Sequence, residues 1–196
     1  MQKQVGRLEL ITGPALSGKT DELIRRVRQV GFAHQKLMVF RGILLGRGGY
    51  SRICSEAGSG FDAFALRHAG EILDYLVESD IQVIAIDDVH FFGKQIVNVV
   101  DELLLRDLRV IVAGLDLDFR ALPFGQTPVL MAMADNVMKL SAICTICTEP
   151  ASRSQRLVDG KPAYWNDPPV FVGLSDRFEP RCRKHHQVNS GSRPQG

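Results

Sequence analysis

The sequence lacks long apolar runs and carries almost no net charge. No stretch approaches the about 18 apolar residues of a membrane-spanning helix, and the opening Met-Gln-Lys-Gln has no apolar core of a signal peptide. Lysine and arginine total 24 against 22 aspartate and glutamate, and the net charge of +2 argues against a basic surface for nucleic acid or membrane. We therefore expect a cytoplasmic protein that binds neither.

Cysteine is also scarce, with four residues in 196. Two of them form a close pair, and in a reducing compartment such a pair indicates a metal site more readily than a disulfide. The length and a hydrophobic content of 45% are enough for one substantial core. We expect one main domain and a small appendage.

Short apolar runs alternate with longer segments of helical period along most of the chain. This order is typical of an α/β fold, in which crossover helices flank a parallel sheet. In the first helix Arg25, Arg26 and Arg28 are expected to face water. Residues 42–60 contain six glycines and predict a loop, either mobile over a ligand or disordered. The pattern predicts strands at residues 8–12, 36–40, 81–86, 109–113 and 139–143, and helices at 21–30, 64–77, 93–106 and 129–137.

The segment GPALSGKT has the spacing that most directly indicates a chemistry. It fits Gly-x-x-x-x-Gly-Lys-Ser/Thr and stands between an apolar strand and a helix. Its glycines let backbone N–H groups turn inward around phosphate oxygens, and the helix that follows directs its positive end at the same anion. Lys19 would reach the β and γ phosphates, and Thr20 would offer its hydroxyl to Mg²⁺. The predicted ATP-binding loop comprises Gly13, Pro14, Ala15, Leu16, Ser17, Gly18, Lys19 and Thr20.

Two carboxylates, Asp87 and Asp88, follow the apolar run at residues 81–86. Acidic residues at the carboxyl end of a central strand lie at the ligand edge of a parallel sheet, beside the phosphate loop. One of them can hold Mg²⁺ through water, and the other is free to act as a base. Alternatively, the pair only caps the helix at residues 93–106.

The segment GLDLDFRALPFG, residues 114–125, places Phe119, Pro123 and Phe124 in a short polar loop. Their rings suggest faces for a flat ligand, although two phenylalanines more often belong to a core. His90, next to the acidic pair, is interpreted as a packed or hydrogen-bonded ring.

The last quarter of the chain contains two pairs of residues with metal-ligand spacing. Cys144 and Cys147 form a CxxC pair, and Cys182 and His185 form a CxxH pair. Together they can supply four tetrahedral ligands to a structural zinc ion, with His186 as an alternative to His185. The competing interpretation is a surface hairpin with unliganded thiols.

Residues 152–158 and 169–173 predict the two strands of a small hairpin between these pairs, with a turn at Asp159 and Gly160. So small a hairpin cannot build its own core, and metal would replace one. The chain is therefore predicted to divide into a nucleotide-binding α/β domain (1–141), a metal-binding domain (142–188) and a disordered tail (189–196).

These motifs resemble those of the zinc-containing, P-loop thymidine kinases, whose nucleotide-binding fold is RecA-like. The resemblance runs from Leu8 to Val188 and rests on GPALSGKT, IDDVHFF, GLDLDFRALPFG, the CTIC knuckle followed by SRSQRLVDGKPAY, and FEPRCRKHH. It implies transfer of the γ-phosphate of Mg-ATP to the 5′-hydroxyl of thymidine or deoxyuridine. It also implies a homotetramer, a structural Zn²⁺ site, and a lasso loop at about residues 156–178 that folds over the nucleoside.

The resemblance assigns roles residue by residue. Asp88 would be the catalytic base, Lys19 would offset the γ-phosphate charge, and Thr20 and Asp87 would hold Mg²⁺. The lasso would act largely through main-chain groups, which can pair with the imide edge of thymine. The implied nucleoside pocket consists of Phe91, Leu115, Phe119, Phe124, Ser154, Phe171, Val172, Gly173, Leu174 and Phe178.

Four positions around the nucleoside depart from the family pattern. Asp88 stands where the family has glutamate, Ala15 where it has methionine, and Phe178 where it has tyrosine. The usual Asp-x-Arg-Tyr run appears only as Arg47-Gly-Gly-Tyr50. These changes motivate an alternative, a catalytically weak nucleotide-binding paralogue that acts as a regulatory or interaction module. A P-loop motor ATPase acting on nucleic acid is a weaker alternative, because no basic stripe accompanies the site.

Overall fold

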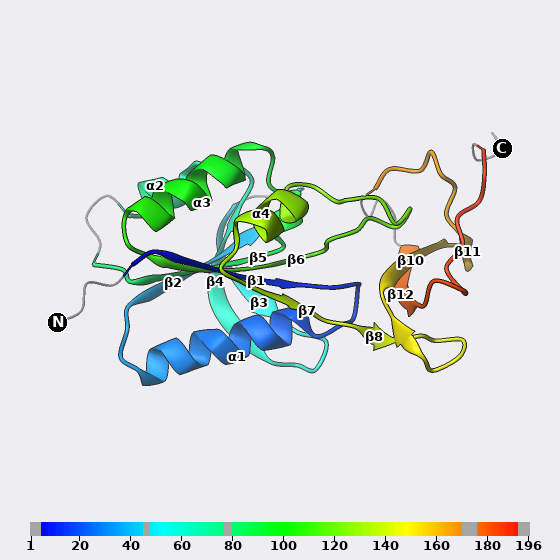
Figure 1. Ribbon diagram of the computed structural model, residues 1–196, viewed down its shortest axis with the longest axis horizontal. Coiled ribbons are helices and arrows are strands. Elements are labelled where there is room, and N and C mark those ends of the chain that lie inside the picture. Colours follow the sequence, from blue (N-terminus) through cyan, green and yellow to red (C-terminus); the bar gives the residue numbers. More distant parts are fainter. Residues whose placement is uncertain (1–4, 45–47, 77–79, 170–175, 192–196) are drawn as a thin grey trace.

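The computed structural model describes residues 5–44, 48–76, 80–169 and 176–191. A layered body, in which helices cover both faces of a sheet, carries a smaller lobe at one end (Figure 1). None of the helices formed by the described residues is long and apolar enough to cross a membrane.

The body is built around a seven-stranded sheet in the order β3-β4-β2-β5-β6-β1-β7. Neighbouring strands are parallel except for the antiparallel pair β3 and β4. The predicted α/β fold, with a largely parallel sheet flanked by helices, is therefore confirmed. Its elements are β1 (Arg7–Thr12), α1 (Lys19–Phe32), β2 (Leu37–Gly42), β3 (Gly49–Cys54), β4 (Gly60–Leu66), α2 (Glu71–Asp74), β5 (Val83–Asp87), the 3-10 helix η1 (Val89–Phe91), α3 (Gln95–Leu105), β6 (Arg109–Gly114), α4 (Thr127–Met133) and β7 (Asn136–Lys139).

Both faces of the sheet are buried, because apolar side chains alternate between them along each strand. Leu10 on β1 and Val112 on β6 belong to the core beneath α3. Their neighbours Ile11 and Ala113 belong to the core beneath α1. Helix α1 covers one face, and α2, α3 and α4 lie on the other (Figure 1). Near-continuous apolar strands are the pattern expected for such a two-sided burial.

The prediction is wrong for residues 42–77. The loop expected at 42–60 contains β3 and the first residue of β4, and the helix expected at 64–77 is reduced to α2, with residue 77 outside the described part of the chain. In β4, Ala63 packs on the α1 side of the sheet, whereas Phe64 and Leu66 pack on the α3 side. Pairing with β2, which places Phe40 opposite Phe64, selects the strand, and this long-range contact leaves no local signal.

The boundary between α4 and β7 also differs from the prediction. The helix expected at 129–137 ends at Met133, and the strand expected at 139–143 is divided between the end of β7 and the lobe. Asp135 is the physical reason: its N–H donates to Leu8 O at 3.0 Å, and its carboxylate accepts from Leu8 N–H at 2.8 Å. This double contact turns the chain out of the helix and starts its pairing with β1.

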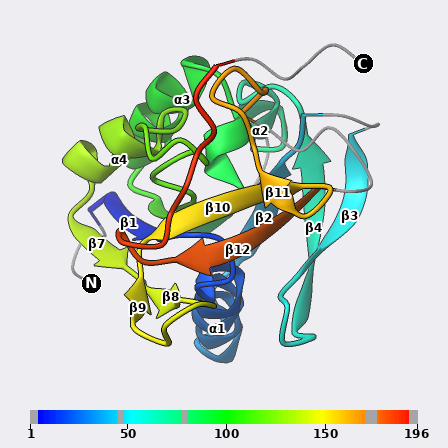
Figure 2. The ribbon, with the colours of Figure 1, turned by 90° about the vertical axis from the view of Figure 1, so that its right-hand side faces the viewer.

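The C-terminal lobe (residues 142–191) contains two small antiparallel sheets. β8 pairs with β9, and β10 lies between β11 and β12; Figure 2 shows this second sheet lying across the end of the body. The first strand of the predicted hairpin corresponds to β10, but Pro169 lies outside any strand and residues 170–173 lie outside the described residues. The strands are β8 (Ala142–Ile143), β9 (Pro150–Ala151), β10 (Arg153–Val158), β11 (Lys161–Pro162) and β12 (Asp176–Arg181).

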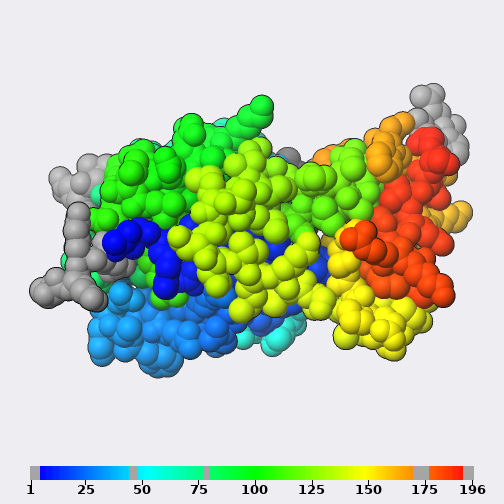
Figure 3. Space-filling view, in the orientation of Figure 1, coloured from blue at the N-terminus to red at the C-terminus, as the bar shows by residue number. Residues whose placement is uncertain are grey.

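Asn189 closes the lobe, although the prediction placed it in a disordered tail. Its N–H donates to Ala163 O at 2.9 Å, its side chain donates to Pro162 O at 2.7 Å, and its carbonyl accepts from Trp165 N–H at 2.9 Å. These bonds tie the end of the lobe to the segment that follows β11. Figure 3 shows the lobe, coloured yellow to red, packed against the body.

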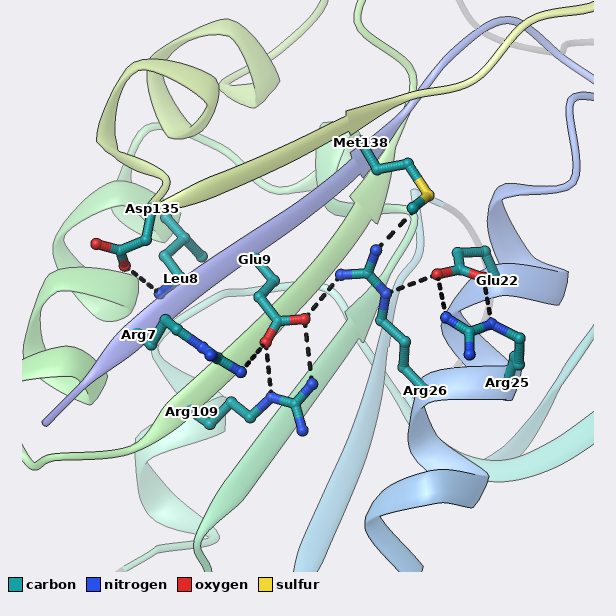
Figure 4. A network of polar contacts seen from close by, with 9 residues as sticks. All are labelled: Arg7, Leu8, Glu9, Glu22, Arg25, Arg26, Arg109, Asp135 and Met138. Carbon is teal, nitrogen blue, oxygen red and sulfur yellow. Dashed lines mark hydrogen bonds and ion pairs between the residues drawn. The ribbon is translucent and has the colours of Figure 1, made fainter. Parts of the chain in front are cut away.

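A buried carboxylate anchors α1, and with it the loop that precedes α1, to the sheet. Glu9 on β1 accepts hydrogen bonds from Arg26 at 2.7 Å and from Arg7 at 2.6 Å (Figure 4). It also accepts two bonds from Arg109, at 2.7 and 3.1 Å. The expectation that Arg26 faces water is wrong, because Glu9 binds its guanidinium from the sheet and leaves the residue only 6% exposed.

Replacing Glu9 with alanine should destabilise the protein, because the buried Arg26 guanidinium would lose its partner on the sheet. Removal of one member of a buried ion pair costs about 3 kcal/mol or more. Urea unfolding at pH 7 measures this difference directly. Equal unfolding free energies for the two proteins would show that the network does not anchor α1.

The stability that Glu9 contributes should depend on pH, and the Glu9→Ala variant measures this dependence. Burial raises the pKa of Glu9, but the hydrogen bond and charge of Arg109, with the charges of Arg7 and Arg26, outweigh burial and hold the pKa below its usual value of 4.5. A depressed folded-state pKa contributes stability above the unfolded-state value and loses it as the pH falls. The difference in unfolding free energy between the wild type and Glu9→Ala should therefore decrease progressively as the pH falls below about 4.5.

Candidate active site

The phosphate loop, residues 13–20, connects the end of β1 to the start of α1. Gly13 has a φ of 146°, and a Cβ added there would come within 2.5 Å of Leu140 O and 2.8 Å of Ser17 Oγ. Only glycine fits this position without displacing the backbone. Lys19 Nζ donates to Pro14 O at 2.7 Å, so the loop curls around its own lysine. The backbone has the inward curl that an anion cradle requires.

A cavity of about 480 Å³ opens directly on this loop. The tip of the β3–β4 hairpin forms its opposite wall, within the segment predicted as a loop either mobile over a ligand or disordered. Phe178 of the lobe also lines the cavity, so the structure places it beside the phosphate loop. The lining residues are Ala15, Leu16, Ser17, Gly18, Lys19, Thr20, Asp21, Cys54, Ser55, Glu56, Ala57 and Phe178.

The two aspartates at the end of β5 lie next to the loop, as predicted for the carboxyl edge of a parallel sheet. Thr20 Oγ1 donates to Asp87 Oδ2 at 3.0 Å, and Asp88 N–H donates to Asp87 Oδ1 at 2.9 Å. Neither carboxylate caps α3, whose N-cap residue is Lys94 and which has no side-chain cap hydrogen bond among the described residues. The capping alternative is therefore wrong, and the pair faces the phosphate loop.

The charged side chains at this edge favour a ligand with a positive part next to Asp87 and a negative part next to Lys19. Burial, together with the adjacent charge of Asp88, raises the pKa of Asp87 to about 7. Burial lowers the pKa of Lys19, while Asp88, Asp87 and Asp116 act in the opposite direction. A divalent cation at Asp87 would favour its ionised form, and phosphate oxygens at Lys19 would favour the ammonium.

Sequence reasoning missed two charged residues at this edge. Arg41, at the end of β2, donates from Nε to Asp88 Oδ2 at 3.0 Å. Asp116, just beyond β6, is buried and forms an ion pair with Lys139 Nζ at 2.7 Å. Arg41 lies at the end of one neighbour of β5, and Asp116 lies just beyond the end of the other, so the available signal was their position at strand ends rather than any motif.

Three of the predicted pocket residues gather around His90. The ring of His90 lies 4.2 Å from that of Phe91 and 5.0 Å from that of Phe124, measured between centroids. Its Nδ1 accepts from Leu115 N–H at 3.1 Å. Burial lowers the pKa of His90 to about 4, so the ring is neutral at pH 7 and carries its proton on Nε2. His90 is the packed, hydrogen-bonded ring that the sequence suggested.

Phe119 lies apart from this ring cluster. It is only 1% exposed, and the guanidinium carbons of Arg120 and Arg156 lie 5.6 and 5.5 Å from its ring centroid. Its carbonyl accepts a hydrogen bond from His186 Nε2 at 2.7 Å. The ring is therefore part of the junction between the 114–125 loop and the C-terminal lobe.

Ser154 connects the lobe to the phosphate loop. Its Oγ accepts a hydrogen bond from Ala15 N–H at 2.9 Å, and the residue is buried. One amide of the phosphate loop is therefore already bonded to the lobe. The remaining predicted pocket residues, Phe171, Val172, Gly173 and Leu174, lie outside the described residues.

The four predicted metal ligands converge in the lobe. Cys147 Sγ lies 3.8 Å from Cys182 Sγ, and His185 Nδ1 lies 3.8 Å from Cys144 Sγ and 3.4 Å from Cys182 Sγ. All four ligand atoms lie within 4.8 Å of one another. A tetrahedral zinc ion with Zn–S bonds of about 2.3 Å holds its sulfurs about 3.8 Å apart, so the donor set fits zinc. His186 points instead to Phe119, which favours His185 as the fourth ligand.

The fold and this edge define a P-loop nucleotide-binding protein with a Cys₃His lobe. The sequence model of the thymidine kinase family matches residues 6–186. The chain therefore belongs to the thymidine kinase family. Membership supports a nucleoside kinase and implies the use of ATP, and the Cys₃His group agrees with the zinc-binding type of the family.

Metal analysis should find about one zinc per chain, bound by the four converging ligands. Replacing Cys147 with serine should lower the zinc content and destabilise the C-terminal lobe, because a thiolate ligand is lost. Cys54→Ser is the matched control, since Cys54 lies on β3 outside this cluster. A metal-free preparation whose lobe resists proteolysis as well as the zinc-loaded protein would contradict this ligand set.

Proposed function

We propose that this protein transfers the γ-phosphoryl group of ATP to the 5′-hydroxyl of thymidine, with deoxyuridine as a second substrate. The family match supports a nucleoside kinase. One observation carries the assignment of the chemistry: Asp88 follows Asp87, which is hydrogen-bonded to Thr20 of the phosphate loop. A proton acceptor and a polyphosphate cradle therefore share one edge of the sheet.

The residues of this edge divide the work of phosphoryl transfer. The amides of residues 13–20 and the Lys19 ammonium would hold the β and γ phosphates in line with the acceptor. Mg²⁺, held by Thr20 and Asp87, would offset charge on the phosphate oxygens. Asp88 would accept the proton of the 5′-hydroxyl as the new O–P bond forms and the bond to ADP breaks. Most of the rate would come from alignment and charge stabilisation.

The nucleoside would lie between Asp88 and the lobe. Phe91, Leu115 and Phe124 gather around His90, two residues along the chain from Asp88, and their apolar side chains would suit a flat pyrimidine. Phe119, Ser154 and residues 171–178 would close the pocket from the lobe side. Ala15, where the family has methionine, leaves more room near the thymine 5-methyl position.

The cellular setting belongs to the same proposal. We expect a cytoplasmic homotetramer that acts on small molecules and on neither nucleic acid nor membrane. The balanced charge of 24 basic against 22 acidic residues supports the last point.

Nucleoside-stimulated release of ADP tests this function. Thymidine and deoxyuridine should stimulate release, whereas purine nucleosides should not. Lys19→Ala should lower turnover by about 10²-fold or more, because it removes the ammonium that stabilises phosphoryl charge. Surface Lys36→Ala, at the opposite end of β2 from the site, is a control that should leave turnover unchanged.

Two outcomes would contradict the proposal. If no nucleoside stimulates ADP release while ATP still binds, the chain is a nucleotide-binding regulatory module. If Lys19→Ala turns over at the wild-type rate, the phosphate loop has been assigned wrongly.

Substitution of Asp88 tests the proposed base. Asp88→Asn cannot accept a proton and should lose about 10² to 10⁴-fold in kcat. Asp88→Glu should retain or raise activity, because it keeps the carboxylate and reaches one methylene further toward the hydroxyl. Steady-state kcat with saturating ATP measures both, and full activity in Asp88→Asn would remove Asp88 from the mechanism.

A further inference from the structure

Arg41 is the charged side chain at the active edge that the proposed mechanism does not use. Its Nε lies 3.0 Å from Asp88 Oδ2. Within the described residues, no other side chain hydrogen-bonds the Asp88 carboxylate, and Oδ1 accepts no hydrogen bond there. The contact therefore occupies one oxygen of the proposed base and leaves the other available.

The backbone on both sides of this pair is held in place. Arg41 is the register partner of Asp87 across the parallel strands β2 and β5. The next residue, Gly42, packs so closely on the turn after β5 that an added Cβ would lie 2.6 Å from Asp88 O. Asp88 itself has a φ of 52°. The pairing of β2 with β5 thus fixes the backbone positions from which the Arg41 and Asp88 side chains extend.

A second cation and a second acid lie near the Asp88 carboxylate. Lys19 attracts it electrostatically from the phosphate loop, and Asp87 repels it from the adjacent position, whereas the nearby ring of His90 is neutral at pH 7. Without a competing cation, the carboxylate would turn toward Lys19. Such a pair would misplace the base and occupy the lysine that the γ-phosphate needs.

We propose that Arg41 is a positioning residue: it holds Asp88 Oδ2 so that Oδ1 faces the 5′-hydroxyl, and it keeps the base from pairing with Lys19. This inference rests on the proposed function. The pair contributes little to stability, because the Arg41 side chain is 41% exposed and that of Asp88 24%. Its role lies in geometry, since a misplacement of about 1 Å can cost about 10²-fold in rate.

A double-mutant cycle on kcat tests the proposal. Arg41→Gln should lower kcat by about 10 to 10²-fold with little change in the KM for ATP. In the Asp88→Asn background the same substitution should have no further effect, because Arg41 acts through Asp88. Arg41→Lys should lose less kcat than Arg41→Gln, because lysine keeps the positive charge but lacks the planar guanidinium.

The controls separate this role from a structural one. Arg106→Gln removes an arginine from a surface pair with Glu102 on α3 and should leave kcat unchanged. Thermal unfolding of Arg41→Gln should match the wild type, which excludes a folding defect as the cause of the loss.

Each contrary outcome has a distinct meaning. Wild-type kcat in Arg41→Gln, with Asp88→Asn still impaired, would overturn the positioning role and leave the kinase intact. If the losses of kcat from Arg41→Gln and Asp88→Asn multiply in the double variant, Arg41 does not act through Asp88. That result would overturn the positioning role in favour of direct contact with the phosphates. Wild-type protein that phosphorylates no nucleoside would overturn the proposed function, and this role of Arg41 with it.

Discussion

The parallel pairing of β1, β2, β5 and β6 is the constraint on which the rest of the structure depends. Because these strands run in the same direction, their carboxyl ends bring four features to one edge: the phosphate loop, Arg41, the acidic pair and Asp116. If β5 were antiparallel, the acids would lie at the opposite end from the loop. The hydrogen bond from Thr20 to Asp87 then joins α1 to β5 and brings the charges of the edge together.

The C-terminal lobe depends on this edge as well as on its own cysteines. Among its described residues, the apolar cluster around the cysteines consists of Ala142, Cys144 and Ala151, with Cys147 and Cys182 packed against it. So little buried area cannot stabilise a lobe of this size, and bound zinc would supply what is missing. The contacts of Ser154 with the phosphate loop and of His186 with Phe119 place the lobe directly on the site. Folding of the lobe and the shape of the active edge are therefore coupled.

Features with a local cause could be predicted from the sequence. The phosphate loop, the acidic pair and the four metal ligands depend on fixed spacings, and all lie where those spacings predicted. Features decided by distant contacts could not: β4 is a strand because Phe64 pairs opposite Phe40, and Arg26 is buried because Glu9 meets it from another element. The contact of Arg41 with Asp88 also depends on tertiary structure and leaves no mark in the local pattern.

The central claim is that one edge of the sheet holds both the triphosphate and the acceptor hydroxyl. A crystal structure with thymidine, Mg²⁺ and a non-hydrolysable ATP analogue tests it most directly. The account predicts the γ-phosphate on Lys19 Nζ and the nucleoside 5′-oxygen within about 2.6 to 3.2 Å of an Asp88 oxygen. A nucleoside bound elsewhere, or a 5′-oxygen turned away from Asp88 while the triphosphate fills the loop, would contradict it.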